Sequence, residues 1–125
     1  MKQKIVGNYY AGSESVQLVL REGDGGEFYN TPEKGFVPRI KIGADEQNWI
    51  MVRTSLLHEI TELIMDKLKC RFCPTNDFSN SHSAYVFLID HTNFSDLCWR
   101  VSEFMDEATP DLRKAWKHWN KKKSK

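Results

Sequence analysis

The sequence predicts an α+β fold, in which a small N-terminal antiparallel sheet precedes a long helix, one further strand and two C-terminal helices. The first 45 residues alternate apolar and polar side chains between glycine turns, which is typical of short strands. After them, apolar residues recur at spacings of three and four, which is typical of helices. A chain of 125 residues with 40% hydrophobic residues is long enough for one modest hydrophobic core and too short for two domains.

Four strands are expected before the first helix. In the second, Leu18 and Leu20 alternate with Val19 and Arg21, so one face of the strand is more apolar than the other. The segment Gly23 to Gly26 then supplies glycines for a hairpin loop, because glycine adopts positive φ without strain. The expected strands cover residues 5–10, 15–21, 27–30 and 37–42.

One long helix is expected from about Asp45 to Lys69, with the Asp45 carboxylate as its N-cap. Its apolar residues at helical spacing are Trp49, Val52, Leu56, Ile60, Leu63 and Ile64. A second interpretation makes residues 49–52 a final strand and starts the helix at Thr54 or Ser55.

The second half of the chain contains one strand and two helices in this interpretation. Residues 70–83 are polar and rich in turn formers, and Ala84 to Ile89 is an apolar run of the length of a buried strand. A helix is expected from Thr92 or Asn93, and Thr109-Pro110 is a second start signal, because proline is favoured at the first helical position.

The segment from His58 to Glu62, His-Glu-Ile-Thr-Glu, is the most specific local pattern in the chain. Residues four apart share a helix face, so His58 and Glu62 can converge on one metal ion. Glu59 points about 100° around the helix from His58, as does the glutamate that serves as general base in the zinc-peptidase motif His-Glu-x-x-His. The pattern predicts a metal site.

With its neighbours Leu56 to Ile60, Leu-Leu-His-Glu-Ile, this motif resembles minimal zincin-type metallopeptidases, including short ones often found in bacteriophages and prophages. The resemblance covers roughly Arg39 to Ile64, and Glu62 stands where zincins have the closing histidine. It implies a zincin-like fold, zinc as cofactor, and hydrolysis with Glu59 as the base on metal-bound water. A peptide substrate could then lie along an exposed sheet edge as an added strand.

Zincins take a third ligand from a later element, and we expect His91, which follows the strand at residues 84–89. Asp90 is a substitute, or it orients His91 as a hydrogen-bonding carboxylate. His82 is a further option.

Two other interpretations compete with this one. His58 and Glu62 lie away from the expected apolar stripe, so they could be solvated surface of a non-catalytic interaction protein encoded by a phage or mobile element. Cys70 and Cys73 have the spacing of a zinc knuckle, and His82 with His91 could complete it. Cys98 lies in a helix stripe, where a small buried hydrophobe is expected.

The charge is divided unevenly. Residues 111–125 carry seven Lys/Arg and one acid, a net +6, and residues 1–110 carry 11 basic and 16 acidic residues, a net −5. We expect one domain over residues 1–120 and a basic disordered tail over 121–125. Trp116 and Trp119 beside the lysines are expected to pack on the core, and nucleic acid binding through this segment is the alternative.

The expected partner is a protein or peptide. No stretch approaches the roughly 20 apolar residues of a membrane helix, and the N-terminus passes into polar Asn8 without the apolar core of a signal peptide. A cytoplasmic protein without a membrane partner is therefore expected.

Overall fold

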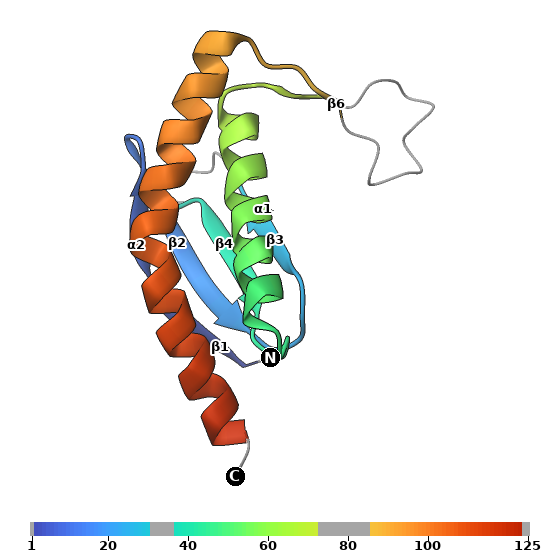
Figure 1. The fold of residues 1–125 in the computed structure, drawn as a ribbon, viewed down its shortest axis with the longest axis vertical. Coiled ribbons are helices and arrows are strands. Elements are labelled where there is room, and N and C mark those ends of the chain that lie inside the picture. Colours follow the sequence, from blue (N-terminus) through green and yellow to red (C-terminus); the bar gives the residue numbers. More distant parts are fainter. Residues whose placement is uncertain (1, 31–36, 73–85, 124–125) are drawn as a thin grey trace.

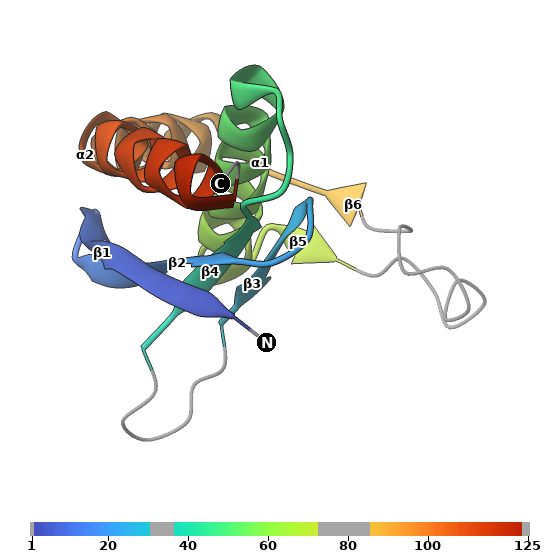
Figure 2. The same ribbon diagram turned by 90° about the horizontal axis from the view of Figure 1, so that it is seen from below.

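The computed structural model describes residues 2–30, 37–72 and 86–123. It has a four-stranded sheet, a two-stranded sheet and two helices (Figure 1). In chain order these are β1 (Gln3–Ala11), β2 (Glu14–Arg21), β3 (Gly26–Tyr29), β4 (Arg39–Gly43), α1 (Trp49–Lys67), β5 (Arg71–Phe72), β6 (Val86–Phe87) and α2 (His91–Lys123). Both helices lie over the same face of the four-stranded sheet (Figure 2). The α+β class and the four expected strands are confirmed.

The sheet is mixed, so the expected antiparallel sheet is wrong. The strand order is β1-β2-β4-β3, and β2 pairs with β4 in parallel, Leu18 beside Ile40 and Leu20 beside Ile42. The other two pairs, β1 with β2 and β3 with β4, are antiparallel. Alternation along a strand predicts which face is buried, but it does not predict which strand lies next to it. In the structure β4, and not β3, lies beside β2 in the middle of the sheet.

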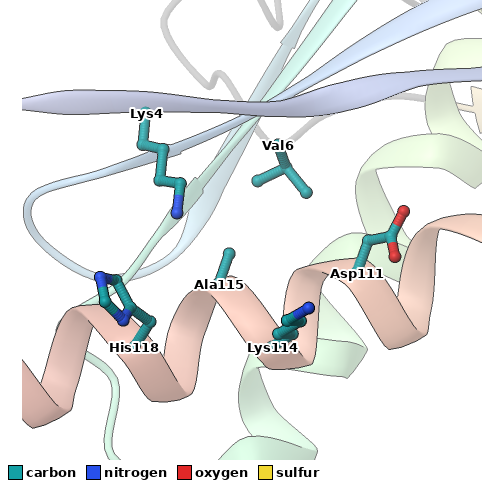
Figure 3. A pocket seen from close by; sticks show the side chains of 6 residues that line it. All are labelled: Lys4, Val6, Asp111, Lys114, Ala115 and His118. Carbon is teal, nitrogen blue, oxygen red and sulfur yellow. The ribbon is translucent and has the colours of Figure 1, made fainter.

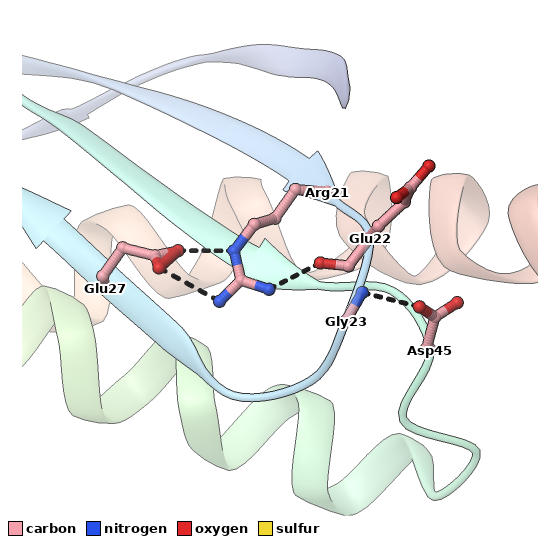
Figure 4. A network of polar contacts seen from close by, with 5 residues as sticks. All are labelled: Arg21, Glu22, Gly23, Glu27 and Asp45. Carbon is pink, nitrogen blue, oxygen red and sulfur yellow. Dashed lines mark hydrogen bonds and ion pairs between the residues drawn. The ribbon is translucent and has the colours of Figure 1, made fainter. Parts of the chain in front are cut away.

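The loop between β2 and β3 is held by polar contacts (Figure 4). The Arg21 guanidinium donates from Nε to Glu27 Oε1 at 2.6 Å and from Nη2 to Glu27 Oε2 at 3.1 Å. The Gly23 amide donates to Asp45 Oδ2 at 2.6 Å. Asp45 therefore joins this loop to the segment after β4 and does not cap α1. The cap is Asn48, whose Oδ1 accepts from the Ile50 amide at 2.9 Å.

Helix α1 begins at Trp49, so the alternative that made residues 49–52 a strand is wrong. The core lies between the sheet and the two helices. Its largest fully buried side chains are Val16, Leu18, Leu20, Ile40, Ile42, Val52, Leu56, Ile60, Leu63, Ile64, Phe104 and Leu112. Alternate residues of the central strands β2 and β4 thus face the helices, as the alternation in the sequence predicts.

Strand β1 is attached to α2 through Tyr9. Its ring lies edge-on to Phe104 with 5.9 Å between centroids, and its hydroxyl donates to Asp111 Oδ2 at 2.7 Å. Burial and the neighbouring Asp111 carboxylate raise the pKa of Tyr9 well above its ordinary value, because both disfavour the phenolate. Tyr9 is therefore a neutral hydrogen-bond donor across the physiological range.

The start signal at Thr109-Pro110 predicted two C-terminal helices, and this prediction is wrong because the structure has one helix there. Helix α2 runs through Pro110 without a break and extends to Lys123, into the segment expected as a tail. Pro110 is exposed, whereas a buried stripe continues along the helix on both sides of it. That stripe consists of Phe104, Ala108, Leu112, Ala115 and Trp119. Packing of these residues on the sheet outweighs the hydrogen bond that proline cannot donate.

Two further expectations for the C-terminal half change. A strand is present within the expected range of residues 84–89, but β6 covers only Val86–Phe87. Phe87 and Leu88 are 42% and 65% exposed, so the expected burial is wrong at these two residues. Cys98 is exposed, which corrects its expected burial. Neither described helix contains a stretch that is both long and apolar enough to cross a membrane.

Replacing Pro110 tests whether α2 is continuous. Within a helix, alanine supplies the missing N–H and removes the ring clash, so Pro110→Ala should raise the free energy of unfolding by about 1 to 3 kcal/mol. Urea unfolding followed by circular dichroism measures this change. Ser102→Ala, at an exposed position of α2, is the control and should change stability by only about 0.5 kcal/mol. No gain for Pro110→Ala would indicate that the proline begins a separate helix.

Candidate metal centre

The motif residues lie in the middle of α1, where one face of the helix packs on the sheet. Val52, Leu56 and Leu63 are buried on that face. The imidazole Nε2 of His58 lies 2.9 Å from Glu62 Oε2, with side-chain exposures of 64% and 19%. The helical spacing of four therefore brings these two residues together, as the sequence predicts.

Glu59 is the one buried charged residue among those that the structure describes, with 8% of its surface exposed. It faces the start of β3: a Cβ built on Gly26 would lie 3.1 Å from Glu59 Cγ and 2.9 Å from Ile42 Cδ1. The absence of a side chain at Gly26 therefore leaves the space that the Glu59 stem occupies. Burying a carboxylate is costly, so its position between helix and sheet needs compensation from its surroundings.

The burial of Glu59 is the feature that sequence reasoning missed. The expected apolar stripe contained Leu56, Ile60 and Leu63 and left Glu59 outside it. The buried stripe instead contains Val52, Leu56, Glu59 and Leu63, spaced by four, three and four residues. A helical stripe of this spacing, with one acid in an apolar series, is the signal that would have found it.

Together, His58, Glu59 and Glu62 form a three-residue cluster of possible ligands. One ligand atom from each lies within 4.8 Å of the others. Four ligands around a zinc ion are about 3.3 Å apart, given metal–ligand distances near 2 Å, so the three atoms would approach one another by up to about 1.5 Å on binding an ion. The cluster combines one imidazole and two carboxylates, so a divalent cation would neutralise it.

His91, the expected third ligand, does not belong to this cluster. It is exposed and is the first residue of α2. Asp90 precedes it and caps that helix, since its Oδ1 accepts from the Asn93 amide at 2.8 Å. Cys70 is buried, while Cys73 and His82 lie outside the described residues, so the proposed zinc knuckle does too.

Comparisons with known proteins identify no family for the chain. No protein-family model, curated protein or solved structure matches the chain.

Adding a methyl group at Gly26 tests the position of Glu59. Gly26→Ala should lower the free energy of unfolding by about 1 to 3 kcal/mol, because the new Cβ overlaps Ile42 and Glu59. In a Glu59→Ala background the cost should be smaller, because one of the two overlapping groups is gone. Urea unfolding of the single and double variants measures the coupling. If Gly26→Ala lowered the free energy of unfolding equally in both backgrounds, Glu59 would not lie against β3.

Proposed function

We propose that this protein binds a divalent metal ion, zinc, through His58, Glu59 and Glu62. The observation that carries the proposal is that the three ligand atoms converge within 4.8 Å on successive turns of one helix. Imidazole nitrogen and carboxylate oxygen are both zinc ligands, and three protein ligands leave a fourth position for water. Bound there, zinc would act as a Lewis acid and make that water more acidic.

The burial of Glu59 favours a metal site over a simple surface ion pair. A His58–Glu62 pair on an exposed helix face contributes only about 0.3 to 0.5 kcal/mol, and it does not require a second carboxylate beneath it. Here a buried carboxylate adjoins the pair, and its approach to Glu62 brings like charges together. A cation between the three groups would remove this repulsion.

Hydrolysis of peptides is a second candidate function, as the zincin resemblance implies. It is favoured by β3, which is an edge strand of the four-stranded sheet and begins beside Glu59. An extended peptide could pair with that edge and pass near the metal. In this scheme Glu59 is the base that accepts a proton from water, so zinc needs a ligand besides His58 and Glu62. No other His, Cys, Asp or Glu among the described residues joins the cluster, and we therefore place metal binding first.

Zinc binding can be measured directly on protein purified without an affinity tag. Isothermal titration should give one zinc ion per chain, and zinc at 100 times its Kd should stabilise the fold by about 2.7 kcal/mol. His58→Ala should weaken zinc binding at least about tenfold, because it removes the nitrogen ligand. His91→Ala is the matched control and should leave the affinity unchanged, since His91 lies outside the cluster. Equal losses in both variants, or no zinc bound, would contradict the proposal.

Glu59→Gln distinguishes a ligand from a base. We expect it to weaken zinc binding about tenfold or more, because a neutral amide is a poorer ligand than a carboxylate. Asp66→Asn makes the same chemical change on α1 outside the cluster and should leave zinc affinity unchanged. Titration of each variant, with a peptidase assay on a casein substrate, separates the roles. Unchanged zinc affinity together with lost hydrolysis would contradict the ligand role and identify Glu59 as the base.

A further inference from the structure

A second site lies where the N-terminal part of α1 meets the middle of α2. There the two helices line an open cleft of about 570 Å³. Trp49 and Arg53 line it from α1, and Arg113, Lys114 and Lys117 line it from α2. Its volume is within the range typical of small-molecule sites. None of the residues that line the cleft is acidic.

The four cations of this cleft have no carboxylate partner among the described residues, unlike Arg21, Lys67 and Arg100. Arg21 pairs with Glu27, and Arg100 pairs with Asp96. Within the described ranges, by contrast, none of the four cleft cations forms an ion pair, and the guanidinium carbon of Arg113 lies 5.5 Å from the Trp49 ring centroid. Four like charges around one concavity repel each other and create a positive potential, which favours an anionic ligand.

Trp49 gives the cleft an aromatic surface held in a defined place. Its ring packs against Trp116 at 5.5 Å between centroids, with 41° between the ring planes. Trp116 is itself anchored, because its Nε1 donates to the backbone oxygen of Glu46 at 2.8 Å. Trp119 is only 8% exposed and packs in the core, as expected. Trp49 is the aromatic residue among those that line the cleft, and it is partly exposed.

We propose that this cleft binds single-stranded nucleic acid, with the four cations on the phosphates and Trp49 against a base. Cations interleaved with an aromatic ring are the features that bind a single strand without sequence preference. Trp49 among the cations favours a nucleic acid over an anionic lipid surface, because a lipid offers phosphates but no base to stack on the ring. This proposal goes beyond metal binding and does not depend on it, since no residue of the cluster lines the cleft.

A neighbouring groove provides a matched control. It lies between β1 and α2 and is lined by Lys4, Asp111, Lys114 and His118 (Figure 3). Continuing from it, Lys2 and Lys122 line the adjoining hollow. The groove contains the Asp111 carboxylate, which partly cancels its positive charge. Lys114 lines both the cleft and the groove, so it is left unchanged in the experiment.

The experiment compares two variants of the full chain that each lose three positive charges. The cleft variant combines Arg53→Gln, Arg113→Gln and Lys117→Gln, and the control variant combines Lys2→Gln, Lys4→Gln and Lys122→Gln. Fluorescence anisotropy with a labelled oligothymidine measures the affinity of each at several salt concentrations. We expect the cleft variant to lose at least about tenfold in affinity, and its log–log salt slope to become shallower by about 2, since each phosphate contact on a single strand contributes about 0.7. The control variant should lose much less.

Trp49 is tested separately. Trp49→Leu should weaken binding about tenfold through loss of stacking, and Trp49→Phe should retain most of it. Circular dichroism checks that each variant is folded, and the triple variants carry the test if Trp49→Leu is not. Equal loss in the two triple variants would overturn the proposal, because it would show that only total charge matters. Absence of oligothymidine binding, or tighter binding to phosphatidylserine vesicles with the same loss in the cleft variant, would overturn it as well.

Discussion

Both helices cover one face of a four-stranded sheet, and the other features of the structure depend on this constraint. The central strands β2 and β4 present their fully buried side chains to that side only, so α1 and α2 must each turn an apolar stripe toward the sheet. For α1 this requirement sets its rotation about its own axis. Glu59 then faces β3 while His58 one residue earlier faces solvent, and the candidate metal centre lies at the edge of the buried face.

The same constraint explains why α2 is one helix. Its buried stripe is continuous from Phe104 to Trp119, and packing on the sheet holds the helix straight enough to continue through Pro110. Hydrogen bonds then tie its C-terminal half to the segment before α1. Asn120 Nδ2 donates to the oxygen of Ala44 at 3.0 Å, and Trp116 Nε1 donates to that of Glu46 at 2.8 Å. These contacts fix the walls of the basic cleft relative to each other.

The position of α2 also changes the meaning of the charge distribution. As a sequence, the +6 of residues 111–125 resembles a solvated tail. In the structure most of this charge lies on an ordered helix, where Arg113 and Lys117 meet Arg53 from α1. Arg53 belongs to the part of the chain with net negative charge, so no window of sequence composition would have joined it to the basic segment. Cations carried on packed helices are partly preorganised for an anionic ligand, whereas the cations of a solvated tail are not.

Sequence alone determined the α+β class, the four N-terminal strands, the long motif helix and the meeting of His58 with Glu62. Each of these follows from a period of two residues or of about 3.6, which depends only on neighbours along the chain. Tertiary structure decided the parallel pairing of β2 with β4, the continuation of α2 through Pro110, the burial of Glu59 and the convergence of Arg53 with Arg113. Those features arise from contacts between residues far apart in the chain, where packing of the shared core outweighs local turn and capping signals.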